Sequence, residues 1–451
     1  MKNFPFSRVL SVYPYERELK SYGFFPPIGL EHISSAVKEY VKEIAILDRR
    51  FEKETSPFLV GVDLILVSIN WWHEEESIKK WIASLPPDVL TIVGGRYATE
   101  NSEEYLQECP NIDIIVRGDG EETIREIVAG KAFDEVAGIS YRNNGKITHN
   151  RTRSLSVVSD SIYPDRSLRR YRYNVLINGI DSGLEIDSIS GSRGCPFNCK
   201  YCDFDANPLG QKREWSGRNP ESVIREIESI SAGHIFFTDD NFTFDQKRVD
   251  KICDLLIERN NKKKFIINTR LNIAKNSALL KKMYRAGFRI LFIGIESTQD
   301  RTLKSMQKGF TTRNVREWSH LLKRFNFFFH GYFIIGNIDE GYSDMIQIPS
   351  FARENGIDTL GLSTLRARKF SPLHELIKER PEYKIDENDK VYSNSLSTDR
   401  LNEIRKEITR NFYVNLFQIG RIMRKLIGLR ILTLRTITRL MVLGGLNLIR
   451  K

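Results

Sequence analysis

The sequence predicts an α/β protein, with an N-terminal doubly wound parallel sheet, a partial, TIM-like (β/α)6 barrel and a C-terminal helical tail. Three observations support this fold class. Short apolar runs alternate with helical patterns along most of the chain, which is the rhythm of parallel βαβ units. The 451 residues exceed one ordinary domain. The last segment differs in kind, because acidic residues stop at Glu407.

The first βα series runs from Arg8 to Ile127. Its strands are almost wholly apolar, as expected where helices cover both faces of a parallel sheet. They are RVLSVYP, EIAILD, VDLILVSIN, DVLTIVGG and IDIIVRG. Several end in small or polar residues that suit a binding crevice at the carboxyl edge. The candidates are Ser68, Asn70, Gly94, Gly95 and Glu121. Tight turns explain the glycines equally well.

A polar connector, residues 141–182, separates the predicted first domain, residues 1–140, from a second βα series in residues 183–385. Its Asn143-Asn144-Gly145 turn predicts a hairpin. The second series contains the runs EIDSIS, HIFFTDD, FIINTR, RILFIGIES, HGYFIIG and TLGLSTL. Six such units suit an open, incomplete barrel, whose chemistry lies at the carboxyl ends of the strands.

The C-terminal region, residues 386–451, reads as basic and amphipathic. Residues 408–451 carry nine basic side chains, so the formal net charge of +11 leaves +2 for residues 1–407. No run reaches the roughly 18 apolar residues of a membrane span. The region is predicted to form helices that contact an anionic membrane surface or pack on the barrel with solvated arginines. Nucleic acid is not expected, because Leu and Ile lie between the arginines where stacking aromatics would be needed.

Five cysteines and an N-terminus without an apolar leader predict a reducing cytoplasm. Cys195, Cys199 and Cys202 form a C-x3-C-x2-C loop directly after the first strand of the second series. Three thiolates can hold a cubane iron–sulfur cluster and leave one iron open, whereas a structural zinc site calls for a fourth ligand. Cys109 and Cys253 are predicted to be small buried apolar residues.

This spacing, with the aromatic Tyr201 before the last cysteine, resembles the radical S-adenosylmethionine (SAM) enzymes. The resemblance implies a 4Fe-4S cluster on the three cysteines whose open iron binds SAM. Reduction by a donor such as flavodoxin or ferredoxin then cleaves SAM to methionine and a 5′-deoxyadenosyl radical.

The same resemblance places SAM-binding residues at successive strand ends. Acidic and amide oxygens would meet the methionine ammonium, an arginine fork would meet the carboxylate, and the later strands would face the ribose and adenine. The implied residues are Tyr201, Asp239, Asp240, Asn241, Arg270, Glu296 and Gly336. Each of these residues could instead lie in a turn or form a surface ion pair.

The first domain resembles the cobalamin-binding domain of cobalamin-dependent radical SAM enzymes. The matching segments are PPIGLEHISSAV, AILDRR with Asp48, IVGGRYAT and RGDGEETI. The loop YPYERELKSYGFFPP lacks the histidine of a D-x-H-x-x-G motif, which implies a cobalt without a histidine ligand, or a domain kept only as structure. Trp71, Trp72 and His73 would lie near the lower face of cobalamin or form an aromatic plug.

Taken together, the resemblances imply an enzyme that uses SAM twice. One SAM would methylate cobalamin, and the other would yield the radical that activates an unactivated carbon for methyl transfer; no side chain is assigned as general acid or base. The substrate is expected to be a small molecule, with a lipid or tetrapyrrole suggested by the apolar tail, and the location cytoplasmic or peripheral at the inner membrane face. The alternatives are cobalamin-assisted cyclisation or oxidation, and a non-catalytic metal-binding or membrane-surface module.

Overall fold

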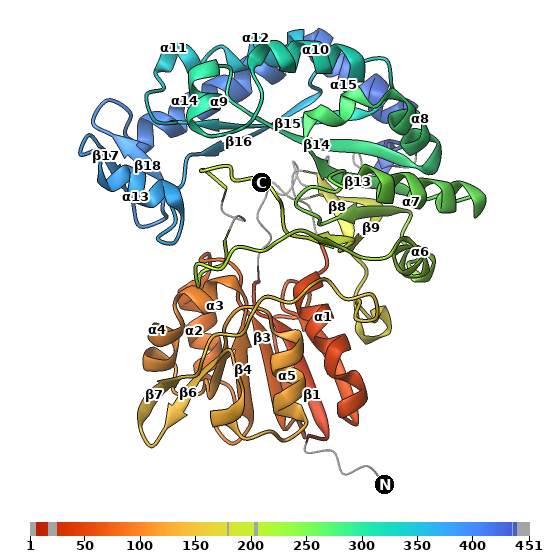
Figure 1. The fold of residues 1–451 in the computed structure, drawn as a ribbon. Coiled ribbons are helices and arrows are strands. Elements are labelled where there is room, and N and C mark those ends of the chain that lie inside the picture. Colours follow the sequence, from red (N-terminus) through yellow and green to blue (C-terminus); the bar gives the residue numbers. More distant parts are fainter. Residues whose placement is uncertain (1–5, 17–24, 178–179, 203–205, 435, 440–451) are drawn as a thin grey trace. The chain divides into compact units, whose positions relative to one another are not determined.

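The computed structural model describes residues 6–16, 25–177, 180–202, 206–434 and 436–439 (Figure 1). Most of the histidine-free loop after the first strand and the last part of the tail, residues 440–451, lie outside the described residues. The chain divides into two compact units. The first extends to Asp181 and also takes in residues 185–188 and 207–211, and the second contains the rest.

The first unit is built on a seven-stranded sheet of order β2-β1-β3-β4-β5-β6-β7. Pairing is parallel from β2 through β5, which confirms the predicted parallel sheet. The strands are β1 (Arg8–Tyr13), β2 (Glu43–Asp48), β3 (Leu64–Ser68), β4 (Leu90–Gly94), β5 (Ile114–Val116), β6 (Ile139–Asn143) and β7 (Lys146–His149). The helices are α1 (Ile28–Val37), α2 (Glu75–Ala83), α3 (Arg96–Glu100), α4 (Ser102–Glu108) and α5 (Glu121–Val128).

Helices cover both faces of this sheet, and each face has its own apolar core. Val9 and Leu66 on the strands pack with Val37 of α1 and Ile124 of α5. On the opposite face, alternate strand residues pack with α2 and α4. Burial on both faces is why the strands are apolar without alternation.

The predicted hairpin is present. Asn144 and Gly145 both have positive φ, 50° and 78°, as a two-residue type I′ turn requires. β6 pairs antiparallel with β5 and β7 pairs with β6, so the hairpin extends the first sheet. The stretch predicted as connector therefore begins inside this sheet.

The backbone conformation at position 95, directly after β4, requires a glycine. Its φ is 106°, and a Cβ there would lie 2.4 Å from the carbonyl oxygen of Ile69. We expect Gly95→Ala to lower the free energy of unfolding of the first unit by at least about 2 kcal/mol, from left-handed strain plus the clash. Gly130→Ala, at φ 84° with nothing within 4 Å, is the control and should cost about half as much. Thermal unfolding measures both, and equal losses would contradict this account.

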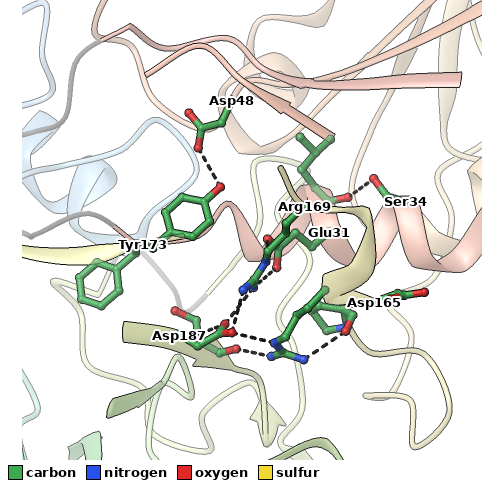
Figure 2. A network of polar contacts seen from close by, with 12 residues as sticks. Glu31, Ser34, Asp48, Asp165, Arg169, Tyr173 and Asp187 are labelled. Carbon is green, nitrogen blue, oxygen red and sulfur yellow. Dashed lines mark hydrogen bonds and ion pairs between the residues drawn. The ribbon is translucent and has the colours of Figure 1, made fainter. Parts of the chain in front are cut away.

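A network of polar contacts holds residues 165–173 of the connector to the first unit (Figure 2). The Arg169 guanidinium donates to both carboxylate oxygens of Glu31 on α1 and to Asp187. The Tyr173 hydroxyl donates to Asp48 at 3.0 Å. Burial raises the pKa of the Glu31 carboxyl despite Arg169. Separating a buried ion pair of this kind costs free energy, because each charge would stay desolvated without its partner. These contacts therefore fix the connector as part of the first unit.

The other seven-stranded sheet has the order β16-β15-β14-β13-β12-β9-β8 and is curled into a partial barrel. Its strands β12 to β16 belong to the second unit, whereas β8 and part of β9 belong to the first. The pairs from β12 to β16 are parallel. All six predicted strands are present. The strands are β8 (Asn174–Ile177), β9 (Ile180–Ile189), β12 (His234–Phe237), β13 (Lys264–Thr269), β14 (Phe288–Glu296), β15 (Phe328–Ile335) and β16 (Thr359–Thr364).

Helices pack on the outer face of the curled sheet over the large apolar core of this unit. They are α6 (Pro220–Ser229), α7 (Gln246–Glu258), α8 (Ser277–Ala286), α9 (Asp300–Ser305), α10 (Thr312–Leu322), α11 (Tyr342–Met345) and α12 (Ile348–Glu354). Asn219 caps α6 by accepting from the Glu221 amide, and Gly287 ends α8 with a φ of 113°. An asparagine before the first turn and a left-handed glycine after the last turn are common at helix ends.

Besides five short 3-10 helices, the remaining described elements are two antiparallel strand pairs and three α-helices. They are β10 (Ser192–Arg193) with β11 (Ser216–Gly217), β17 (Tyr383–Ile385) with β18 (Val391–Ser393), α13 (Pro372–Lys378), α14 (Thr398–Tyr413) and α15 (Leu416–Gly428). Across the described ranges, every helix is too short or too polar to cross a membrane.

Candidate functional site

The three loop cysteines lie just after β10, and the loop is held against the ends of β13 and α9. Cys199 is buried, and its Sγ lies 3.6 Å from Nη1 of Arg270. The Arg270 guanidinium also stacks on Phe197, 3.9 Å from the ring centroid, and donates to the Lys308 carbonyl. Arg270, predicted to meet the SAM carboxylate, thus clamps the cysteine loop.

The donor set of this loop fits an iron–sulfur cluster. Cys195 and Cys202 are half-buried, Cys199 is buried, and a cationic side chain lies beside the Cys199 sulfur, which suits an anionic cluster. Within the described ranges, no three Cys, His, Asp or Glu side chains converge in a metal-binding arrangement.

A buried ion pair lies at the end of β14, beside the cysteine loop. Lys308 Nζ is 2.8 Å from Glu296 Oε1 and 2.8 Å from the Tyr201 hydroxyl, which donates to the same carboxylate oxygen at 3.0 Å. Burial raises the pKa of Tyr201 well above its ordinary value, so the phenol stays protonated. Glu296 has a positive φ of 75°, which turns its side chain back over Gly294, where a Cβ would meet the carboxylate. Tyr201 and Glu296, predicted separately, are thus brought together.

The segment after β12 turns mostly inward. Asp239 is buried and accepts from the Gly191 amide and the Ser192 hydroxyl at the start of the cysteine loop. Burial raises the pKa of Asp239 to about 6. Asp240 accepts from the Gly194 amide at 3.2 Å. Of the three predicted residues, Asn241 alone has a buried side-chain oxygen, Oδ1, without a hydrogen-bond partner among the described residues. It fits an added donor such as an ammonium.

Gly336 follows β15 in a left-handed conformation with a φ of 73°, and Leu401 approaches it closely. Its amide faces the sulfur of Met345 at 3.3 Å. Nearby, Glu340 is buried and accepts from the Asn337 amide at 3.1 Å and from Ser297 at 3.2 Å. The strand end predicted to face adenine therefore contains a buried carboxyl that the sequence did not indicate.

Burial raises the pKa of Glu340 from 4.5 to about 7. The folded state therefore holds this proton more tightly than the unfolded chain, so the free energy of unfolding should fall as pH rises from about 4.5 to about 7. Glu340→Gln should flatten this part of the stability profile, and Glu354→Gln, at an exposed position on α12, should leave it unchanged. Denaturant midpoints across this pH range provide the measurement. A slope of the same size in Glu340→Gln would refute the assignment.

In the first unit, the predicted residues of β3 and β4 converge. Asn70 donates to the Ser68 hydroxyl at 2.9 Å and accepts from the Arg96 amide at 3.1 Å. Gly94 ends β4, and Gly95 lies against the Ile69 carbonyl. Glu121 lies apart from them in the chain, as the first residue of α5. The carboxyl edge of β3 and β4 therefore presents a small polar group of side chains.

The same edge is lined by aromatics. The buried Tyr15 hydroxyl accepts from the amides of Asn70 and Trp71, and its ring stacks on His73 at 4.5 Å. Burial lowers the pKa of His73. Trp71 and Trp72 are 41% and 38% exposed. Two open indoles beside polar donors and acceptors fit a large flat ligand such as a corrin.

A second surface of interest is the inner face of the curled sheet. Along β12 and β13 buried and half-buried side chains alternate, and the buried ones face the helices. The half-buried ones form the other face, where the register places Asn268, Phe292, His330 and Thr359 side by side in one row. The His330 ring lies 4.9 Å from Phe292 and 4.7 Å from Tyr332. Burial lowers the pKa of His330 to about 4, so it is neutral near pH 7.

Sequence reasoning missed several of these residues. Lys308 lies 12 positions after Glu296, and no local spacing links them. Tyr15 lies in the loop YPYERELKSYGFFPP and Phe197 in the cysteine loop, and no spacing singles out either residue. His330 carried a weak signal, because it is a polar residue within an apolar strand.

Comparisons with known proteins agree with this geometry. Residues 19–128 match the B12 binding domain and residues 189–352 the radical SAM superfamily. The uncharacterized methyltransferase PH0819 of Pyrococcus horikoshii is 29% identical over 356 residues, 74% of each chain. The anaerobic magnesium-protoporphyrin IX monomethyl ester cyclase of Cereibacter sphaeroides is 27% identical over 368 residues, 78% of this chain and 58% of the cyclase. The hopanoid C-3 methylase of Methylococcus capsulatus is 23% identical over 296 residues, 62% of this chain and 55% of the methylase.

The fold is also that of a solved enzyme. The radical SAM methyltransferase TsrM from Kitasatospora setae, with cobalamin and a 4Fe-4S cluster bound, superimposes with a TM-score of 0.67 at 16% identity, over 90% of this chain and 81% of TsrM. The cofactors are accordingly a 4Fe-4S cluster, SAM and cobalamin. With a B12 binding domain and a radical SAM core in one polypeptide, the chain belongs to the cobalamin-dependent radical SAM enzyme family.

Proposed function

We propose that this enzyme methylates an unactivated carbon of an apolar small molecule, with reducing electrons from a flavodoxin or ferredoxin. The observation that carries the proposal is the C-x3-C-x2-C loop clamped by Arg270 beside the Tyr201–Glu296–Lys308 cluster, in a chain that also has a B12 binding domain. Two of the relatives are named as a methyltransferase and a methylase, which supports methyl transfer.

Different residues of the chain would bind the different cofactors. Cys195, Cys199 and Cys202 would hold the cluster, which with SAM supplies a carbon radical while cobalamin supplies the methyl group. Glu296, paired with Lys308 at 2.8 Å, would accept hydrogen bonds from SAM hydroxyl or ammonium groups. Asn241 would present its free side-chain oxygen to the ammonium. Trp71 and Trp72 would cover one face of cobalamin and exclude water from it.

The inner face of the curled sheet supports an apolar substrate. Its central rows carry Phe292, Tyr332 and a neutral His330, whose Nδ1 lies 2.8 Å from the Thr359 hydroxyl. The aromatic rings of these rows would offer apolar surface to a flat ring system. The cyclase and hopanoid methylase relatives carry tetrapyrrole and hopanoid substrates in their names, which supports an apolar polycyclic substrate.

A second candidate is cyclisation or oxidation without methyl transfer, which the cyclase relative favours. Anaerobic incubation of the reconstituted enzyme with methyl-labelled SAM, a reductant and cell extract separates the two. Methyl transfer predicts label in an apolar metabolite together with S-adenosylhomocysteine and deoxyadenosine. Deoxyadenosine without S-adenosylhomocysteine would support cyclisation or oxidation, and the absence of both products would refute the two functions together.

A further inference from the structure

Helix α15 packs on the barrel with its polar side, whereas a surface helix of a globular protein usually packs with its apolar side. Its polar side faces inward: Gln418 is buried and donates to the Asp358 carbonyl at 2.7 Å. Lys425 pairs with the fully buried Asp358 carboxylate at 2.6 Å, and Arg421 donates to the Ile357 carbonyl. The basic residues predicted to be solvated are therefore in part the residues that attach this helix to the barrel.

The outward side of α15 is apolar. Leu416, Met423 and Ile427 recur at helical spacing on one stripe, with Phe417 beside them. Leu416 is 86%, Phe417 91% and Ile427 49% exposed. Large apolar side chains grouped in this way on a surface mark an interaction site, whereas single ones do not.

The charges around the stripe indicate what covers it. Arg424 and Arg430 are exposed, and Arg410 is exposed on the preceding helix α14. No acidic residue occurs in residues 408–451. A second copy of the chain placed on this stripe would bring two basic segments face to face, which is unfavourable. An anionic lipid surface satisfies both features, because acyl chains accept the apolar stripe and headgroups attract the arginines.

We propose that the outward stripe of α15 docks this enzyme onto an anionic membrane surface. The helix has 13 residues and is about 20 Å long. It is too short to span a bilayer, so it would lie in the plane of the interface. The Asp358 contacts hold the polar side of the helix to the barrel, so that docking needs no refolding of α15. This inference concerns residues outside those assigned to the cofactors and does not depend on methyl transfer.

The test uses the full-length reconstituted protein and flotation with phosphatidylcholine vesicles, with and without phosphatidylglycerol. We expect binding only to the anionic vesicles, and a decrease at high salt. The double variant Phe417→Ser/Ile427→Ser should bind at least about tenfold more weakly. Arg424→Gln/Arg430→Gln should weaken the salt dependence of binding. The matched control Val60→Ser/Val157→Ser, at positions 70% and 76% exposed in the first unit, should bind like the wild type.

All these positions are exposed and lie outside the cofactor sites, so SAM cleavage and thermal stability should stay unchanged in every variant. A wild-type protein that does not bind anionic vesicles would overturn the proposal. It would also be overturned if Phe417→Ser/Ile427→Ser bound vesicles normally, or if its only effect were to turn a dimer into a monomer without lipid, since a second copy would then cover the stripe.

Discussion

Replacing Cys199 with serine should remove the iron–sulfur cluster and, with it, SAM cleavage. Cys199 is the buried member of the three loop cysteines and the one beside Arg270. Loss of an outer-shell partner of a metal site typically costs about 10–100-fold, so loss of a ligand should lower deoxyadenosine formation by at least about a hundredfold. Iron and sulfide content, visible absorption and deoxyadenosine yield after anaerobic reconstitution measure the effect.

The other two cysteines provide the matched controls for Cys199. Cys109 and Cys253 are buried in the apolar cores of the two units. Burial raises the pKa of both thiols, which keeps them protonated and unreactive. Cys109→Ala and Cys253→Ala should keep the full cluster and lose only about 1 kcal/mol of stability. If Cys253→Ala lost iron as completely as Cys199→Ser, the assignment of the loop would be wrong.

Lys308→Met should have the largest effect on stability outside the cluster. It leaves the Glu296 carboxylate buried with Tyr201 as its remaining donor among the contacts described. Removing one partner of a buried ion pair typically costs about 3–5 kcal/mol, because the other charge stays desolvated. Urea unfolding of the apoprotein measures this loss, and equilibrium binding to the reconstituted enzyme tests whether SAM affinity falls with it.

Three further variants separate the ion pair from a general packing defect. Lys304→Met, at an exposed position on the neighbouring helix α9, should change neither stability nor SAM affinity. Lys308→Arg should recover most of the stability. Glu296→Gln/Lys308→Met should be more stable than Lys308→Met alone, since no buried charge is left. SAM affinity should stay low in this double variant. A double variant with normal SAM affinity would show that Glu296 and Lys308 serve packing only.

Much of the fold could be predicted because it depends on near neighbours in the chain. The apolar runs of β3 and β13, the Asn144-Gly145 turn and the Asn219 cap of α6 all rest on contacts within a few residues. The cysteine loop is equally local, since its three ligands span eight residues. The polar residues at strand ends follow from the parallel order of the strands, which places all carboxyl ends on one edge.

Local patterns could not predict which side chains pair with one another across the fold. Lys308 reaches Glu296 because α9 folds back beside β14, and Asp239 turns toward Gly191 because β9 and β12 are neighbours. The periodicity of residues 416–428 shows two faces but not which one packs on the protein. Asp358 determines this, because a buried carboxylate more than fifty residues away needs the Lys425 charge and draws the polar face inward. Long-range pairing of buried charges is a property of the folded chain, and local sequence does not encode it.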